Sequence, residues 1–479
     1  MNQPQNNPAK KVIVIGAGPA GLAAAHELVK LGASVEVFEA SKHIGGMARS
    51  FELFGQRVDC GPHRFFSKDK IVNQFFRETV KDQFTLVNRL TRIYYNGSFF
   101  NYPLKIFNVL RNLSPVQVVA ILYSFGYQKL FPMKSPKSFE DWVTDRFGKK
   151  LFNIFFKTYS EKLWGIPCSK IDADWAAQRI KTLTLFQAVI NALVGDKDQK
   201  HKTLVDQFAY PNGGTGAIYE NAARYVNQNG GQVQLEKPIR KVIVENGEAK
   251  GVVLASGETK LADAVISTMP LTLMVKGLDN VPADVLSACG SLYFRNTILV
   301  YFEVNHTRLF PDNWIYIHSS EVRHGRLTNF RNWCPSLYRD KNTSILCMEF
   351  WAFEQDEIWK DSDENISRLG IEELHKIKLV PAHAEVLNTF VLKIPKCYPV
   401  YETGYREKMD VISKYLDSIE NLYPIGRYGA FKYNNQDHSI LMGVLAARKI
   451  VSNAAVNLWE INTDTEYQEE GKIKDVLIQ

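Results

Sequence analysis

The chain has 479 residues, 45% of them hydrophobic and 12% aromatic, which suits a globular enzyme of two or three packed units. Its formal net charge of +7 is spread along the sequence without a basic block, so composition favours small anionic ligands and excludes a nucleic-acid partner. Residues 1–10 are polar and lack the order of a secretion signal, and the six cysteines lack metal-ligand spacing. We therefore expect a flexible N-terminus, a cytoplasmic location, reduced cysteines and no metal site.

The first elements predict a dinucleotide-binding unit. Residues 12–15 form an apolar run typical of a buried parallel strand, and residues 22–31 predict the helix that follows. The turn between them has the glycine spacing that lets backbone approach a pyrophosphate at a helix N-terminus. A second strand, 35–38, ends in Glu39, about 20 residues downstream, where a carboxylate can accept hydrogen bonds from ribose hydroxyls. The expected cofactor contacts are Gly16, Gly18, Pro19, Ala20, Gly21, Glu39 and Ala40.

A second glycine pair follows this unit. Two adjacent glycines let the backbone lie against a phosphate, and Arg49 adds positive charge there. The alternative is a glycine turn with a solvated arginine. The run resembles the motif that follows the Rossmann unit in flavin amine oxidases and protoporphyrinogen oxidases. That resemblance implies FAD, held without a covalent link, and adds as contacts Gly45, Gly46, Met47, Ala48 and Arg49.

The middle of the chain changes character. Residues 91–100 alternate around Asn96-Gly97, which predicts a tight hairpin. Residues 103–200 are helical in pattern and rich in aromatic side chains, which predicts an inserted unit. Within it, 103–133 is apolar enough to suggest contact with a membrane surface, although its segments are too short to span a bilayer. Packing in the core or as a lid is the interpretation that we favour.

The α/β pattern returns from residue 208. A glycine loop at Gly213 has no obvious preceding strand, so we interpret it as a helix start and not as a second phosphate loop. Strands are predicted at 233–235, 239–244, 251–255, 264–268, 297–303, 314–318 and 344–350.

These patterns predict the domain organisation. The expected fold is an α/β protein with α+β elements in its second lobe. A discontinuous Rossmann-like FAD-binding domain of the amine-oxidase and glutathione-reductase type accompanies a substrate domain that mixes helices with an antiparallel sheet. The expected FAD-binding segments are 11–95, 208–290 and 421–457, the helical substrate or lid insertion is 96–207, the substrate-domain sheet is 291–420, and the polar tail is 458–479.

The segment Gly61-Pro62-His63 resembles a loop beside the isoalloxazine ring in the UDP-galactopyranose mutase family. In that family the histidine senses the redox state of the flavin, so the resemblance implies that all three residues contact the cofactor. A proton on the imidazole can compensate the charge of anionic reduced flavin. The alternative is a turn histidine bonded to backbone.

Three more stretches carry the same resemblance toward a substrate. Tyr159 and Trp164 stand where the mutases place an aromatic ring on uracil and another near the sugar. Arg179 and Arg326 stand where the mutases carry diphosphate-binding arginines, and a guanidinium fork matches two phosphate oxygens. Core packing of the rings and surface placement of the arginines remain alternatives. Tyr398 matches a Tyr-Pro segment that also reaches the substrate.

The last stretch resembles the Gly-Arg and tyrosine run before the final helix of the mutases. It implies that Gly426 and Arg427 contact the flavin and that Tyr433 reaches the diphosphate. The start of the next helix can stabilise negative charge that develops on the flavin. The further cofactor contacts expected here and upstream are Ile239, Asn435, Gln436, Asp437 and Ser439.

The resemblance implies an FAD-dependent isomerisation of a nucleoside-diphosphate sugar in glycan biosynthesis, with flavin N5 as the reacting atom. The residues expected around the chemistry are His63, Arg179, Arg326 and Tyr433, and NAD(P)H is a candidate external reductant. Phe66 stands where the mutases have a second histidine. Two alternatives stay open: an oxidoreductase that takes hydride from a C–N or C–C bond, and a non-catalytic FAD-bound scaffold.

Overall fold

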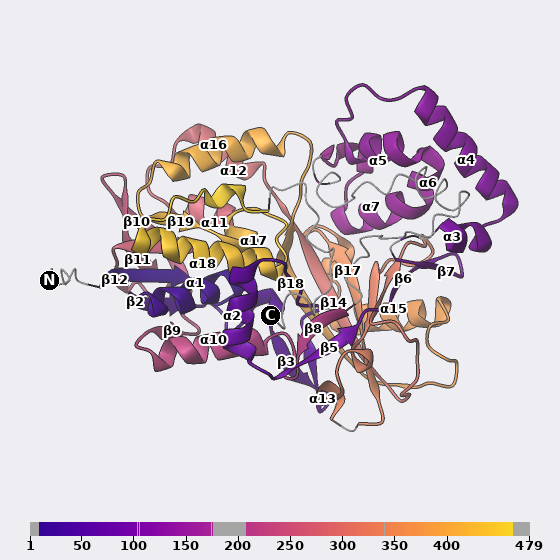
Figure 1. The fold of residues 1–479 in the computed structure, drawn as a ribbon, viewed down its shortest axis with the longest axis horizontal. Helices are drawn as coiled ribbons and strands as arrows, with labels where there is room; N and C mark the ends of the chain where they lie inside the picture. Colours follow the sequence, from indigo (N-terminus) through magenta and orange to yellow (C-terminus); the bar gives the residue numbers. More distant parts are fainter. Residues whose placement is uncertain are drawn as a thin grey trace.

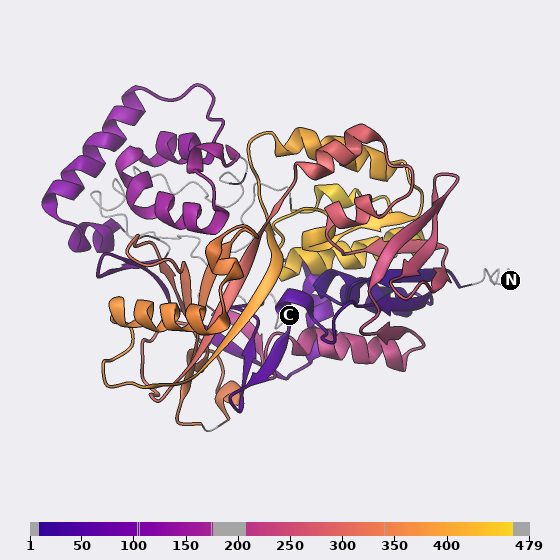
Figure 2. The same cartoon turned by 180° about the vertical axis from the view of Figure 1, so that it is seen from behind.

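The computed structural model describes residues 9–102, 104, 106–173, 175, 207–339 and 341–462. Two sheet-based units lie side by side, one built on a parallel sheet and the other on a mostly antiparallel sheet, and a group of helices lies at one end of the second unit (Figures 1 and 2). The parallel sheet is assembled from segments near the beginning, the middle and the end of the chain. The expected α/β class, with a discontinuous Rossmann-like domain and a mixed second lobe, is confirmed.

The parallel sheet has five strands, all paired in the same direction. Across the sheet they are β19 (Leu422–Pro424), β13 (Ala264–Ser267), β1 (Lys11–Ile15), β2 (Ser34–Phe38) and β9 (Gln232–Gln234). The central strand β1 is almost completely buried, as expected for a parallel sheet covered on both faces. The carboxyl ends of β1 and β2 therefore meet at one edge, where the glycine turn begins.

Four helices pack together around this unit: α1 (Pro19–Lys30), α2 (Lys70–Val80), α10 (Ala217–Gln228) and α18 (Gln436–Ser452). The contact between α1 and α18 is close because Gly443 has no side chain. A Cβ at this position would overlap the carbonyl oxygen of Ala20. The last long helix is thus held against the first turn of α1, beside the predicted cofactor turn.

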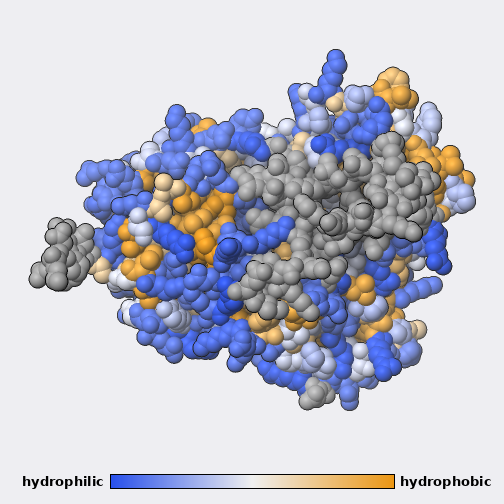
Figure 3. Space-filling model, viewed as in Figure 1, coloured by the Kyte–Doolittle hydropathy of each residue, from blue (hydrophilic) through white to orange (hydrophobic). Residues whose placement is uncertain are grey.

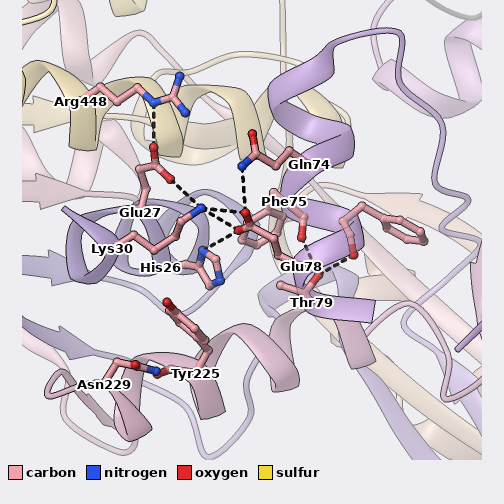
Figure 4. Close-up of polar contacts among 11 residues, drawn as sticks. His26, Glu27, Lys30, Gln74, Phe75, Glu78, Thr79, Tyr225, Asn229 and Arg448 are labelled. Carbon is pink, nitrogen blue, oxygen red and sulfur yellow. Dashed lines mark hydrogen bonds and ion pairs between the residues drawn. The ribbon is translucent and has the colours of Figure 1, made fainter. Parts of the chain in front are cut away.

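A charged cluster joins three of these helices on their outer side (Figure 4). Glu27 accepts a hydrogen bond of 2.7 Å from Arg448 Nε, and Lys30 Nζ lies 2.8 Å from the carboxylate of Glu78. Each partly exposed pair contributes little alone. His26 lies beneath them, only 2% exposed, and burial lowers its pKa to about 4. The imidazole is therefore neutral at pH 7 and packs as part of the helix interface.

The second sheet has seven strands. In order they are β18 (Val386–Pro399), β14 (Phe294–Val304), β17 (Ser344–Ala352), β16 (Arg326–Asn329), β15 (Trp314–Ile317), β6 (Thr91–Tyr95) and β7 (Ser98–Asn101). All neighbours are antiparallel except β15 and β6. Strands β14 and β17 are buried along their whole length, and α15 (Asp363–Lys376) packs on one face, where a Cβ on Gly370 would lie 2.5 Å from Phe302.

The predicted hairpin around Asn96-Gly97 is confirmed as β6 and β7. Its partner is the second sheet, because β6 pairs with β15. The domain boundary expected at residue 95 therefore divides this hairpin. The long edge strand β18 was not predicted, since its exposed and buried residues alternate irregularly.

The inserted helices are α3 (Ile106–Asn112), α4 (Pro115–Leu130), α5 (Phe139–Phe147), α6 (Lys149–Phe152) and α7 (Thr158–Trp164), with a π-helical stretch at Asn153–Lys157. The interpretation of 103–133 as core or lid packing holds only in part for α4, which packs on α5 and α6 and buries Ile121 and Gln128. One face of this helix carries large apolar side chains that are exposed to solvent.

The remaining strands form smaller sheets: β10 (Ile239–Glu245) with β11 (Glu248–Leu254) and β12 (Thr259–Leu261), β3 (Ser50–Leu53) with β4 (Gln56–Asp59), and β5 (Phe84–Asn88) with β8 (Gln207–Pro211). The remaining α-helices are α11 (Leu271–Lys276), α12 (Ala283–Gly290), α13 (Pro335–Tyr338), α14 (Glu357–Lys360), α16 (Tyr405–Asp417) and α17 (Gly426–Gly429). A strand, β8, does precede the Gly213 loop, which corrects the sequence argument. Because β8 pairs only with antiparallel β5 among the described strands, the loop is still a helix start and not a second Rossmann turn.

Candidate active site

The turn after β1 is shaped so that only glycine fits at two positions. Gly16 has a φ of +100°, and a Cβ there would overlap Thr268 Oγ1. A Cβ on Gly21 would overlap the carbonyl oxygen of Gly16. The N-cap of α1 is Gly18, and no described side chain caps this helix. The first N–H groups of α1 therefore remain available to an anion, which the positive end of the helix dipole favours.

The second glycine pair lies directly against this turn. Gly45 N–H donates to the carbonyl of Ala17 at 2.9 Å. Gly46 has a φ of +55°, and a Cβ there would lie 3.2 Å from Gly18 Cα. Arg49 Nη1 donates to the carbonyl of Gly46 at 2.9 Å. The two motifs thus form one surface, the glycine cradle, defined by residues 16–21 and 45–49.

Glu39 organises the loops at the end of β2. Its carboxylate accepts hydrogen bonds from Ala17 N–H at 2.8 Å and Ser41 N–H at 2.9 Å. Its carbonyl accepts from Lys237 N–H at 2.9 Å, which brings the segment before Ile239 alongside. Each carboxylate oxygen keeps a second lone pair, so the side chain can also accept from a ribose hydroxyl. Glu39 and the start of β10 therefore border the same end of the cradle.

The start of α18 lies beside the other end of the cradle. A Cβ on Gly426 would lie 2.9 Å from Ala20 Cβ, so α17 packs tightly on α1. Asn435, expected to contact the cofactor, is the N-cap of α18. Gln436, also expected to contact the cofactor, instead makes a hydrogen bond within the protein, from its Nε2 to the carbonyl of Arg64 at 2.7 Å. The other two expected contacts are buried in the first turn: Asp437 and Ser439.

The loop with Gly61 and His63 is anchored by residues that sequence reasoning missed. The Tyr301 hydroxyl donates to the carbonyl of Asp59 at 2.7 Å and accepts from Gly61 N–H at 3.3 Å. The buried Asp59 carboxylate accepts hydrogen bonds from Ser50 Oγ, Tyr210 OH and Thr215 N–H. Burial raises the pKa of Asp59 to about 7. In the sequence, the run Val-Asp-Cys-Gly indicates the role of Asp59 only weakly, because the residues that bind Asp59 lie far away along the chain.

His63 itself points back to its own turn. Its Nδ1 lies 3.1 Å from the carbonyl of Gly61, the geometry of a backbone-bonded turn histidine. Burial, followed by repulsion from Arg326, lowers the pKa of His63 to about 4. The ring is therefore neutral at pH 7. Arg427 of α17 and Arg49 of the cradle also lower the pKa of His63, so the ring lies near three arginines.

Arg326 forms a buried fork with an unexpected partner. Its Nε and Nη2 donate to the two carboxylate oxygens of Glu349 at 2.5 and 2.6 Å, across directly paired positions of β16 and β17. Burial opposes the charge of Arg326, but Glu349 more than offsets this and raises its pKa. Two of its donors are thus already engaged. The only sign of this pair in the sequence was Glu349, the single acidic residue in the apolar strand of residues 344–352. Arg179, the other expected arginine, lies outside the described residues.

Four aromatic residues lie near Arg326 or Arg427, and we name them the aromatic cage: Tyr159, Trp164, Tyr398 and Tyr433. The Tyr398 and Tyr433 rings stack with centroids 5.5 Å apart, and Arg427 lies 4.6 and 4.4 Å from them. Trp164 is 5.7 Å from Tyr433 but is fully buried. The full burial of Trp164 fits the alternative of core packing for this ring.

The cage contains buried donors without a described partner. Tyr159 stacks on His318 at 4.9 Å and meets Trp351 edge-on at 5.8 Å, two neighbours that sequence reasoning missed. Among the described residues, the buried groups Arg427 Nη2, Trp164 Nε1 and Trp351 Nε1 have no hydrogen-bond partner. Unpaired buried donors are costly. The three side chains all lie near the Tyr398 ring, at 6.4 Å for Trp164 and Trp351 and 4.6 Å for Arg427. A polar or anionic ligand beside this ring would suit these donors.

A family comparison decides the class of protein. Residues 19–393 match the family model described as flavin containing amine oxidoreductase. The chain belongs to this family. It is an FAD-dependent enzyme with the fold inferred above.

Relatives within the family differ in the reactions that their names state. A probable UDP-galactopyranose mutase from Klebsiella pneumoniae is 27% identical over 174 residues, 34% of this chain and 44% of that protein. The match thus spans less than half of that relative. A coproporphyrinogen III oxidase from Staphylococcus aureus is 19% identical over 475 residues, 92% of this chain and 99% of that protein.

Solved structures support the fold of this FAD-dependent enzyme. A reduced UDP-galactopyranose mutase matches with a TM-score of 0.83 at 22% identity, covering 96% of this chain and 97% of that one. A putative protoporphyrinogen oxidase from Exiguobacterium matches with a TM-score of 0.72 at 15% identity, covering 93% and 100%. At these identities the likeness concerns the fold alone.

The residues present fit FAD. The glycine cradle leaves backbone N–H groups beside positions where a Cβ would collide, as a closely held pyrophosphate requires. Glu39 stands at the ribose end, and Arg427, with an unpaired buried Nη2 among described residues, stands at the opposite end. These groups would hold the cofactor between the cradle and the aromatic cage.

Proposed function

We propose that the protein is an FAD-dependent isomerase of a nucleoside-diphosphate sugar, resembling UDP-galactopyranose mutase. One observation carries the proposal: a cationic, aromatic enclosure adjoins the cofactor cradle. Met47 of the cradle lies 3.5 Å, sulfur to sulfur, from Cys397, and the carbonyl of Cys397 accepts from Arg427 Nε at 2.9 Å. A diphosphate needs positive charge and donors, and a nucleoside base needs a ring to stack on.

The side chains divide these tasks. Burial raises the pKa of Tyr398 well above its ordinary value, so its hydroxyl stays protonated and donates at neutral pH. Arg427 supplies charge beside Tyr398 and Tyr433. Neutral His63 keeps one ring proton at pH 7, and because a carbonyl oxygen only accepts, this proton is on Nδ1 and is donated to the carbonyl of Gly61. One face of the Tyr159 ring stacks on His318 at 4.9 Å, so a nucleoside base would stack on the other face.

The isomerisation needs no nucleophile from the chain. When bound and reduced, FAD supplies the electron-rich nitrogen that ring opening requires. The enclosing rings exclude water, which protects the glycosyl centre from hydrolysis. Arg427 and the tyrosine hydroxyls hold the diphosphate while its bond to the sugar is broken.

A second function has its own support. The oxidase from Staphylococcus aureus aligns with almost the whole chain, and Arg326, expected to bind diphosphate, is held by Glu349. An oxidoreductase that takes hydride from a bulky aromatic substrate would also use the aromatic cage. It would not require recognition of a diphosphate.

Binding of UDP distinguishes the two. The holoenzyme, oxidised and dithionite-reduced, is titrated with UDP while the flavin absorbance is followed. Tyr398→Phe removes one donor to a charged group, so UDP should bind about tenfold more weakly, corresponding to roughly 1.5 kcal/mol. The matched control is Tyr415→Phe, a tyrosine on α16 away from the cage. It should leave the affinity unchanged.

Two results would contradict the proposal. One is the absence of any UDP-dependent change in the flavin spectrum in both redox states. The other is equal UDP affinity for Tyr398→Phe, Tyr415→Phe and the wild type.

A further inference from the structure

Helix α4 presents its apolar side chains to solvent. Val116, Tyr123 and Leu130 are 79, 74 and 77% exposed. The full set of large exposed residues on this helix and the turn after it is Val116, Val119, Leu122, Tyr123, Tyr127, Leu130, Phe131 and Met133, and we name it the α4 face. Helix α4 forms the outer edge of the inserted helices in both views, and the space-filling view shows hydrophobic surface at that edge (Figures 1, 2 and 3).

The α4 face is ordered and not a scatter of single residues. Val116, Val119, Tyr123, Tyr127 and Leu130 recur at steps of three and four residues, which places them within about 80° of the helix circumference. The two buried residues, Ile121 and Gln128, lie on the other side. A helix of a globular protein normally turns its apolar stripe to the core. Helix α4 does the reverse, and contiguous exposed apolar surface of this kind marks an interaction site.

Charge around the α4 face has one sign. Between Gln83 and Phe139 the sequence contains no aspartate or glutamate. The exposed charged residues beside the face are Arg111, Lys129, Lys134 and Lys137. The nearest acid on the packed helix α5, Asp145, is engaged by Met133 N–H at 2.8 Å. Glu140 on the same helix pairs with Lys149.

We propose that the α4 face docks this protein onto an anionic lipid bilayer, with α4 lying in the plane of the interface. Tyrosine and phenylalanine side chains suit the headgroup region, and lysine and arginine bind anionic lipid. A protein partner would require an acidic rim to complement the lysines, and a second copy of this face would bring like charges together. No described helix is long and apolar enough to cross a membrane, so the contact is with one leaflet.

The face is held rigidly to the substrate lobe. Lys150 N–H donates to Ser124 Oγ at 3.1 Å, and Gly148 lets the backbone of Phe125 approach, since a Cβ there would lie 2.8 Å from Phe125 N. Helix α6 continues through the π-helical stretch into α7, which carries Tyr159 and Trp164. Docking would therefore bring the helices that lead to Tyr159 and Trp164 near the lipid surface.

Vesicle co-sedimentation of the full-length holoenzyme tests the proposal. The wild type should bind vesicles of phosphatidylcholine with phosphatidylglycerol and bind pure phosphatidylcholine weakly, with binding that falls as salt rises. Val119→Glu/Tyr123→Glu should lower the bound fraction at least about tenfold, and Lys129→Gln/Lys134→Gln by about fivefold per charge removed. The matched control is Leu261→Glu, at an apolar position 62% exposed on β12. It should bind like the wild type.

The flavin spectrum and melting temperature confirm that each variant is folded, which is expected because the altered side chains are exposed. Equal binding of Val119→Glu/Tyr123→Glu and Leu261→Glu would overturn the proposal. So would the absence of wild-type binding to the anionic vesicles. A dimer in solution that only the α4 variants dissociate, without vesicle binding, would assign the face to a second copy and also overturn it.

Discussion

Replacing Gly46 by alanine should separate cofactor binding from backbone strain. Gly46 has a φ of +55° and Gly32 a φ of +82°, so alanine at either position should lower the free energy of unfolding by about 1–2 kcal/mol. A Cβ at 46 would lie 3.2 Å from Gly18 Cα, whereas a Cβ at 32 would meet no described atom within 4 Å. Only Gly46→Ala therefore pushes the second loop away from the N-terminus of α1.

That displacement should weaken backbone hydrogen bonds to the pyrophosphate. A hydrogen bond to a charged group contributes about 1.5–3 kcal/mol, so FAD affinity should fall roughly tenfold to a hundredfold in Gly46→Ala. Apoprotein titrated with FAD gives the affinity, and urea unfolding of both apoproteins gives the strain. Equal FAD affinity in Gly46→Ala and Gly32→Ala would refute the assignment of the cradle, whether both variants keep the wild-type affinity or both lose it to the same extent.

Two further predictions concern buried charge. Arg326→Ala should lower the free energy of unfolding, measured with urea, by about 3 kcal/mol, because it leaves the buried Glu349 carboxylate without its partner. The control Lys241→Ala breaks an exposed pair and should change this free energy by less than about 1 kcal/mol. Similar losses in both variants would contradict the buried pairing. The native pKa of His26 is about 4, below its ordinary 6.5, so the unfolded chain binds the proton first and stability falls as pH drops from 6.5 toward 4. Between pH 8 and pH 5 the wild type should therefore lose about 2 kcal/mol more than His26→Gln, and parallel pH profiles would contradict this.

The sequence predicted the cofactor half of the site because its signals are local. Gly16, Gly21 and Gly46 act through turns and neighbours a few residues away, and the strand and helix around them are strongly patterned. The other half depends on pairs distant along the chain. Glu349 meets Arg326 only because β16 and β17 pair in register, and Asp59 meets Tyr210 across the lobe.

The second limit on prediction from the sequence was the orientation of apolar side chains, toward the core or toward solvent. The apolar pattern of α4 was visible, but a helical period alone does not state whether a stripe faces the core or the solvent. The same holds for Trp164, for which substrate contact and core packing were both open from the sequence, whereas the fold buries its ring completely, 5.7 Å from that of Tyr433.

The most direct test of the proposed isomerase is its electron balance. Dithionite-reduced holoenzyme is incubated with UDP-galactose without oxygen, and the ring isomers of the nucleotide sugar are separated and counted against the flavin that becomes oxidised. We predict many isomerised molecules for each reduced flavin, no net loss of reductant, and no substrate-dependent oxygen uptake by the oxidised enzyme. Stoichiometric oxygen consumption with an oxidised product, or the absence of isomerisation by the reduced enzyme, would contradict the proposal.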